Sequence, residues 1–338
     1  MTTNTSLLAD PERLSMPFRS RVSADVDRAR THHLNWIAAR GLWPSARAEA
    51  AYRAADFPLF AASVYPWARG EDLDLLTDLL GWAWLWDDSL DRPGPRQADV
   101  AHTASLLNVY RNVLHGRMAL VPSAPLADAW HQLLQRLEER TSKQWRQLHA
   151  ALWEATYASF LQEARNNAAG SVPSFQEYLS MRREAGGPSI CFIWAEAAGR
   201  YEVPAHVYAS EDLQTLDQAA EDVVIMTNDL FSVSNEWSDG NTNNIILVLA
   251  QQENCSWHEA ARRAEDIINT TMVHFQDAES HFLSSHLYQD LAIQDRANTD
   301  RFLDVLKAWM SGSLNWHRSS ARYQSTNITA STSQPERQ

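Results

Sequence analysis

The chain has 338 residues, of which 45% are hydrophobic and 21% are charged, a composition typical of a folded globular protein with a large core. It carries 29 Lys and Arg against 42 Asp and Glu, so its net charge of −13, without a basic stripe, argues against a nucleic-acid partner. Its two cysteines, Cys191 and Cys255, do not indicate a disulfide framework or a thiolate zinc site, and we expect a reducing, cytoplasmic setting.

The domain organisation predicted from composition is a single helical domain over residues 16–323. The ends, residues 1–15 and 324–338, are polar and are expected to be disordered. The N-terminus lacks the apolar region of a signal peptide, and no apolar stretch approaches the length of a membrane span. We therefore expect a soluble protein, for which a homodimer is an open possibility.

Apolar residues recur at helical spacing almost everywhere and only 11 residues are Gly, which predicts an all-α fold. The first informative helix has an apolar face from Leu73 to Trp84 that leads into Asp87 and Asp88, and Arg-Pro-Gly-Pro at 92–95 should end it. Carboxylates at a helix C-terminus oppose the helix dipole, and a bound cation would relieve a cost of up to about 1 kcal/mol per charge.

The later helices are predicted from their start and stop signals. Ser174 and Glu177 form a capping box, and Gly-Gly-Pro at 186–188 should end the helix that the box opens. Three more helices are predicted: a long one over 211–237, one that a second capping box opens at 256–259 and that runs toward 286, and one over 298–320.

Two polar motifs stand out against this apolar background. Residues 87–91 read Asp-Asp-Ser-Leu-Asp, and Asn228, Ser232 and Glu236 follow one another at i, i+4 and i+8. On a helix each motif makes a row of oxygen ligands. Carboxylate, amide and hydroxyl oxygens suit Mg²⁺, which usually completes its shell with water and substrate phosphate oxygens. The pair of motifs therefore predicts a phosphorylated substrate held between two helices.

Other interpretations of the acidic motif are weaker. Short acidic clusters at helix ends are commonly just solvated. Here, however, the cluster follows the apolar stretch 81–86, so its carboxylates should lie near a buried face, where unpaired charge is costly. A calcium loop is not indicated, because the alternating oxygen ligands, the central Gly and the closing Glu are missing.

The two motifs, in this order and 141 residues apart, resemble those of bacterial class I terpene synthases. Two further features are similar to that family. Arg182 lies 46 residues before Asn228, the position of the family's diphosphate-sensing Arg, and Arg322-Tyr323 matches its C-terminal Arg-Tyr pair. The four matches extend over the chain from Asp87 to Tyr323.

The resemblance implies a role for each matching residue. It implies a class I terpenoid synthase-like bundle around a central apolar cavity, in which Mg²⁺, three ions in the family, binds with the diphosphate. The implied metal ligands are Asp87, Asn228, Ser232 and Glu236, with Asp88 and Asp91 in support, as partners that orient the ligands or Arg182. The implied diphosphate contacts are Arg182, Arg322 and Tyr323, and the carbonyl of Gly186 would help to trigger ionisation.

Ionisation would leave a carbocation, which needs a cavity that excludes water and offers electron-rich aromatic faces. The chain has 14 Trp. Trp84, one turn before Asp88, is the leading candidate for the cavity wall, whereas Trp82 and Trp86 fall off that face and are expected to pack between helices. Core packing is the alternative for each further candidate, namely Phe57, Phe192, Phe231, Trp309 and Trp316.

Two positions depart from the family pattern. Asn235 replaces a Lys that many members have before the last Glu of the second motif, and Ala185 replaces an acid that links the sensor Arg to the effector segment. One diphosphate contact is therefore expected to be missing, and the adjacent Glu184 cannot be assumed to replace the acid. Neither departure removes a metal ligand.

The function that we expect is cyclisation of a linear isoprenyl diphosphate after Mg²⁺-assisted ionisation. Farnesyl diphosphate is the leading substrate, and geranylgeranyl diphosphate is a close alternative. A chain-elongating prenyltransferase should carry a second Asp-rich motif where this chain has 228–236. A non-catalytic isoprenoid-binding protein is the remaining alternative, and the intact ligand set argues against it.

Overall fold

The computed structural model describes residues 11–90, 100–117, 124–238 and 241–324. Within these ranges the chain is helical and contains no strand, which confirms the predicted all-α class. The described elements are a 3-10 turn, η1 (Pro11–Arg13), and the helices α1 (Val26–Ala39), α2 (Ala46–Ala55), α3 (Phe57–Val64), α4 (Gly70–Leu90), α5 (Val100–Leu114), α6 (Pro125–Glu138), α7 (Lys143–Ala169), α8 (Phe175–Gly186), α9 (Pro188–Gly199), α10 (Ala205–Tyr208), α11 (Glu211–Ser238), α12 (Ile245–Glu253), α13 (Trp257–Ser284), α14 (His286–Gln289), α15 (Ile293–Ser319) and α16 (Ala321–Gln324).

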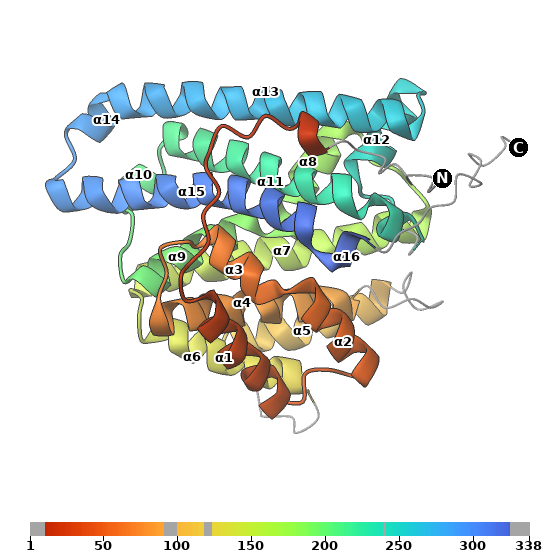
Figure 1. Cartoon of the computed structure of the whole chain (residues 1–338), viewed down its shortest axis with the longest axis horizontal. Helices are drawn as coiled ribbons and strands as arrows, with labels where there is room; N and C mark the ends of the chain where they lie inside the picture. Colours follow the sequence, from red (N-terminus) through yellow and green to blue (C-terminus); the bar gives the residue numbers. More distant parts are fainter. Residues whose placement is uncertain (1–10, 91–99, 118–123, 239–240, 325–338) are drawn as a thin grey trace, which may run out of the picture.

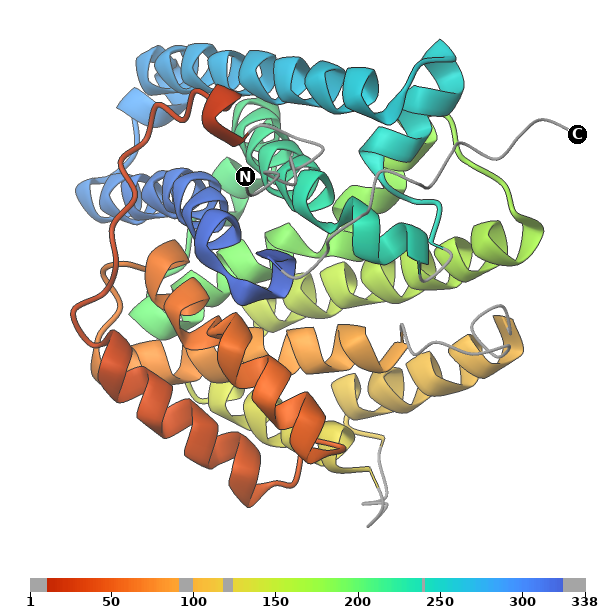
Figure 2. The same ribbon diagram turned by 45° about the vertical axis from the view of Figure 1, so that its right-hand side comes forward.

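Helix α11 lies among the helices of one half of the molecule, as Figure 1 shows. On one side α11 packs against α13, and elsewhere it contacts α8, α9, α12 and α15. Helix α4 packs against α1, α3, α6 and α9 in the other half of the molecule. In both views α13 lies along one outer side and α1 and α6 lie on the opposite side, with α7, α9 and α15 between them (Figure 2). The two polar motifs are thus carried by helices from opposite halves of the bundle.

Helix α4 is buried because its sequence is apolar over several turns. Leu73, Leu76 and Leu79 are fully buried, and the helix continues without a break to Asp87 in its last turn. A helix that is apolar around most of its circumference is stable only inside a protein. Burial of this helix therefore brings its acidic end close to the interior.

The predicted break between α8 and α9 is present. Gly187 adopts a left-handed conformation with φ of 59°, and Pro188 has no N–H with which to continue the helix. Pro188 cannot donate to the carbonyl of Glu184, four residues before it. This carbonyl instead accepts a hydrogen bond from the Thr156 hydroxyl of α7 at 2.8 Å. Thr156 therefore satisfies the carbonyl that the helix break leaves without a backbone donor, and Gly186 lies beside the cavity described below.

Most predicted helix boundaries are confirmed to within a residue or two. Both capping boxes are present, and α11 matches the helix predicted over 211–237. The last long helix begins at Ile293, five residues before the predicted start, and the helix expected to run toward 286 ends at Ser284. In the described residues no helix has the length and apolar character needed to cross a membrane.

Candidate active site

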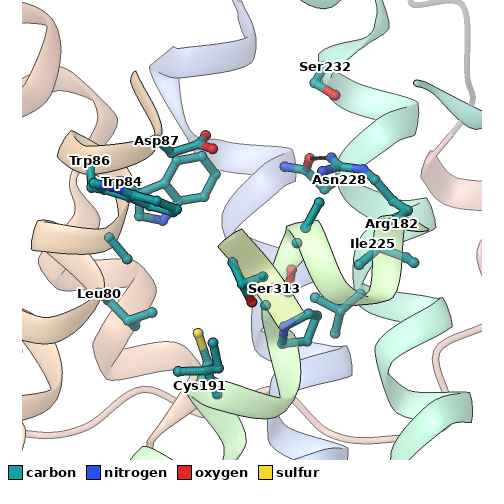
Figure 3. Close-up of a pocket in the computed structure, with 18 of the residues that line it drawn as sticks. Leu80, Trp84, Trp86, Asp87, Arg182, Cys191, Ile225, Asn228, Ser232 and Ser313 are labelled. Carbon is teal, nitrogen blue, oxygen red and sulfur yellow. Dashed lines mark hydrogen bonds between the residues drawn. The ribbon is translucent and has the colours of Figure 1, made fainter. Parts of the chain in front are cut away.

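A cavity of about 380 Å³ lies between α4, α7, α8, α9, α11 and α15. Figure 3 shows its two ends: Leu80 and Cys191 lie at the apolar end, and Asp87, Asn228 and Ser232 lie at the polar end. Polar side chains thus gather at one end of a space that is otherwise lined by aromatic and aliphatic groups. This arrangement suits a ligand with a charged head and a hydrocarbon tail.

The first motif supplies one side of the polar end. Asp87 is half-buried, and burial, together with the neighbouring Asp88, raises the pKa of its carboxyl to about 7, although Arg182 and Arg322 offset part of this shift. Asp88 accepts a hydrogen bond of 2.7 Å from Arg322, so its guanidinium partner in this structure is Arg322 and not Arg182. Asp91 lies outside the described residues.

Arg322 is held from two sides. Besides its ion pair with Asp88, its guanidinium lies 4.8 Å above the ring of Trp84, within range of a cation–π interaction. Trp84 itself lines the cavity, as the sequence predicted. The Arg322 guanidinium, which lines the polar end of the cavity, therefore stacks on Trp84, a residue of the aromatic wall.

The second motif forms one polar stripe along α11. The Ser232 hydroxyl donates to Glu236 Oε1 at 2.7 Å, one turn away. Burial raises the pKa of Glu236 to about 7 and the nearby Asp229 adds to the shift, whereas Arg182, 3.8 Å away, lowers it. Asn228, Ser232, Asn235 and Glu236 all line the cavity.

Arg182 reaches this stripe from α8. Its Nη2 donates to Asn228 Oδ1 at 3.1 Å, which brings together the two residues that the sequence analysis paired by spacing. Its Nε and Nη2 also donate to Asp229 Oδ1, at 3.1 and 2.9 Å. Asp229 is fully buried and was missed by sequence reasoning, although it directly follows Asn228 in the motif. It is an acidic partner of Arg182, and its carboxylate also accepts from Tyr178 and the Ile245 N–H.

His317 is a further cavity residue that the sequence analysis missed. Its Nδ1 lies 2.8 Å from the carbonyl oxygen of Ser313, so Nδ1 must carry the proton and donate it there. Its Nε2 then accepts from Asn228 Nδ2 at 3.1 Å, and the same amide donates to the Tyr323 hydroxyl at 3.2 Å. Burial lowers the pKa of His317 to about 4, so the ring is neutral at pH 7.

The predicted wall aromatics separate into two groups. Trp84 and Trp309 line the cavity. The others pack behind lining residues with ring centroids 4.6 to 5.6 Å apart: Phe57 behind Trp84, Phe192 behind Trp309, Trp316 behind Phe60 and Phe231 behind His317. Trp82 is buried between helices as expected, but Trp86 lines the cavity, contrary to expectation. The wall aromatics that the sequence analysis did not assign to the cavity are Phe60, Trp86, Trp153, Phe160 and Trp194.

The residues at the polar end fit a hard divalent cation. The candidate ligands are oxygens of a carboxylate, an amide, a hydroxyl and a second carboxylate, from two facing helices. Burial and a neighbouring carboxylate raise the pKa values of both Asp87 and Glu236, so a bound cation would favour the ionised forms of these groups. In the described part of the chain, no three His, Cys, Asp or Glu side chains cluster as a complete metal cage.

Comparisons with known proteins agree with this geometry. Residues 78–273 match the family model "Terpene synthase family 2, C-terminal metal binding". The chain is 31% identical to pentalenene synthase of Streptomyces avermitilis, over 91% of each chain. It is also 31% identical to R-linalool synthase of Streptomyces clavuligerus, over 91% of this chain and 92% of that one.

Solved structures show the same architecture. Germacradien-4-ol synthase from Streptomyces citricolor superposes with a TM-score of 0.80 at 27% identity, covering 90% of this chain and 97% of the other. A linalool/nerolidol synthase from Streptomyces clavuligerus gives 0.80 at 28% identity, covering 90% and 100%. With its fold, its two oxygen-rich motifs and a matched family model over more than half its length, the chain belongs to the bacterial class I terpene synthases, lyases that act on prenyl diphosphates.

Proposed function

We propose that the protein ionises farnesyl diphosphate with Mg²⁺ and cyclises the resulting carbocation to a sesquiterpene. The observation that carries this proposal is the placement of Asp87 opposite the stripe of Asn228, Ser232 and Glu236, at one end of an aromatic cavity. Two relatives support the substrate, because their names describe them as farnesyl diphosphate cyclising: a 7-epi-alpha-eudesmol synthase at 27% identity and a beta-caryophyllene synthase at 26%.

The diphosphate binds at the polar end. Arg182 and Arg322 provide planar guanidinium forks for phosphate oxygens, and Tyr323 adds a neutral donor. Asp87, Asn228, Ser232 and Glu236 would hold Mg²⁺, three ions by family resemblance, which would supply positive charge beside the leaving diphosphate. As the allylic C–O bond breaks, its electron pair leaves with the diphosphate, and the two guanidiniums stabilise the charge that develops there.

The hydrocarbon chain occupies the apolar end. Trp84, Trp86 and Trp309 line this space, where they stabilise the carbocation through cation–π attraction and exclude water. Ring closure uses the electrons of a double bond in the same chain, and loss of a proton or capture of water ends the reaction. The folding of the chain against these walls determines the ring skeleton.

Other chain lengths are the alternatives within the same reaction class. A linalool/nerolidol synthase at 29% identity, whose structure was solved in complex with 2-fluorogeranyl diphosphate, favours a test of the shorter geranyl diphosphate, and the longer geranylgeranyl diphosphate stays the other candidate. A chain-elongating prenyltransferase and a non-catalytic binding protein rank lower, because the second motif has the Asn-Ser-Glu form and its ligand set is intact.

The experiment is incubation of the purified protein with each of the three diphosphates, with Mg²⁺ or with a chelator, followed by gas chromatography and mass spectrometry. A Mg²⁺-dependent cyclic product from farnesyl diphosphate is the expected result. A product from only one of the other substrates would correct the chain length. Elongated diphosphates in a parallel reaction with isopentenyl diphosphate, or no product at all from folded protein, would overturn the proposal.

A further inference from the structure

Asn244 is the residue just before α12, and its side chain connects this helix to the second motif. It is fully buried, and its Oδ1 caps α12 by accepting from the Ile246 N–H at 2.9 Å. Its Nδ2 donates to Glu236 Oε2 and to the backbone carbonyl of Asp229, each at 2.9 Å. Both donor hydrogens and the acceptor oxygen of this amide are therefore used.

The first amide of α12 makes a second connection. The Ile245 N–H donates to Asp229 Oδ2 at 2.9 Å, and the Tyr178 hydroxyl donates to the same oxygen at 2.6 Å. These two bonds leave Asp229 Oδ1 to receive Arg182. The start of α12 thus contacts Glu236 directly, through the Asn244 side chain. It contacts Arg182 indirectly, because the Ile245 N–H binds the Asp229 carboxylate that pairs with Arg182.

We propose that Asn244 is a positioning residue which, with the Ile245 amide, orients Glu236 for metal binding and aims Arg182 through Asp229. The inference rests on the proposed function. It adds a structural cause for the geometry of two residues that come from different helices, α8 and α11. Neither sequence motif includes Asn244, which lies eight residues after Glu236.

The orientation of Glu236 depends directly on this frame. Asn244 binds Oε2 and Ser232 binds Oε1, so both carboxylate oxygens have a fixed neighbour before any cation arrives. A ligand that is already held in one orientation loses less conformational entropy on binding a metal, and loss of such outer partners typically lowers metal affinity about 10- to 100-fold. Without Asn244, Glu236 could rotate toward Arg182, which lies 3.8 Å away.

The test separates capping from positioning. Asn244→Ser keeps a good N-cap oxygen but has no amide to reach Glu236. Asn244→Asp keeps the shape and the cap, and replaces the donor with a second carboxylate. The control is Ser142→Ala, which removes the cap of α7, where Ser142 accepts from the Trp145 N–H at 3.1 Å. That cap lies 11 residues before Trp153, the first cavity residue of α7, about 16 Å along the helix.

The readout is calorimetric titration of inorganic diphosphate at a series of Mg²⁺ concentrations, together with thermal unfolding of the ligand-free proteins. We expect Asn244→Ser to raise the Mg²⁺ concentration for half-maximal binding about tenfold or more, and Asn244→Asp to raise it further. Ser142→Ala should lower thermal stability and leave the Mg²⁺ dependence unchanged. Rates with farnesyl diphosphate should recover in Asn244→Ser at high Mg²⁺.

Two results would overturn the inference. If Asn244→Ser and Asn244→Asp bind diphosphate with wild-type Mg²⁺ dependence, Asn244 serves only as a helix cap. If the wild-type protein shows no Mg²⁺-dependent binding of diphosphate, the proposed function fails and the positioning role fails with it. A wild type that binds diphosphate but forms a product from another substrate would correct the substrate and leave the positioning role in place.

Discussion

Replacement of His317 by Phe should weaken catalysis through Asn228 without disturbing the shape of the wall. The variant keeps an aromatic ring but removes the Nε2 acceptor, 3.1 Å from Asn228 Nδ2, and the Nδ1 donor, 2.8 Å from the Ser313 carbonyl. In the variant, Asn228 Nδ2 would keep the Tyr323 hydroxyl as an acceptor but lose His317 Nε2. A neutral hydrogen bond of this kind contributes about 0.5–1.5 kcal/mol, so we expect kcat/KM to fall roughly two- to twelvefold.

The assay is release of diphosphate with farnesyl diphosphate at several Mg²⁺ concentrations, for wild type, His317→Phe and His317→Gln. Gln offers a carbonyl oxygen to Asn228 and an amide hydrogen to Ser313, so it should recover part of the loss. Because burial lowers the pKa of His317 to about 4, the ring stays neutral above pH 6. The ratio of wild-type to variant rates should therefore be constant from pH 6 to 9.

Two outcomes would refute this reasoning. Equal kcat/KM and equal Mg²⁺ dependence in wild type and His317→Phe would show that Asn228 needs no acceptor at this position. A rate ratio that changes with pH, around the usual pKa of an imidazole, would show that His317 exchanges a proton during turnover and does not simply hold Asn228.

Three other changes have clear expectations. Asp87→Ala should abolish Mg²⁺-dependent product formation and leave the helical circular dichroism unchanged; product at the wild-type rate would remove Asp87 from the site. Gly312→Ala would place a Cβ 2.4 Å from the Ser63 carbonyl oxygen of α3, and should cost about 1–3 kcal/mol in urea unfolding, whereas an unchanged midpoint would contradict this close approach. The hydrogen bond to Asp78 raises the pKa of His32 above 6.5, so its stabilising effect is present below pH 6.5 and is lost as pH rises through the raised value. His32→Gln should therefore lose less unfolding free energy than wild type between pH 6 and 8.5, and equal losses would contradict the assignment.

The polar site could be predicted from sequence because it depends on local spacing. Asn228, Ser232 and Glu236 share one helical stripe whatever the rest of the fold does, and the bond between Ser232 and Glu236 follows from that stripe. The contact of Arg182 with Asn228 was predictable only through family resemblance, since the two residues lie on different helices. The ion pair of Arg182 with Asp229 could not be predicted either, because it depends on how α8 meets α11.

The cavity wall could not be predicted in the same way. Trp84 and Trp86 are two residues apart on α4, and helical geometry places them on different faces. Both nevertheless line the cavity, because the cavity extends between α4 and α7, where Trp86 meets Trp153 and Phe160 with ring centroids 5.4 and 4.9 Å apart. Which of many buried aromatics faces an internal space depends on the neighbouring helices, and a single sequence does not contain that information.

The charges at the polar end explain why substrate and cation should bind together. Among the described residues, Arg182 and Arg322 face five carboxyl groups, those of Asp87, Asp88, Glu163, Asp229 and Glu236. If all of these groups ionise, the site has an excess of three negative charges, and this repulsion adds to burial in raising the pKa values of Asp87 and Glu236. Arg182 is already paired with Asp229, and Arg322 is already paired with Asp88. A diphosphate that arrives alone would meet repulsion and occupied donors, whereas one that arrives with divalent cations reverses the balance and frees the guanidiniums to bind it.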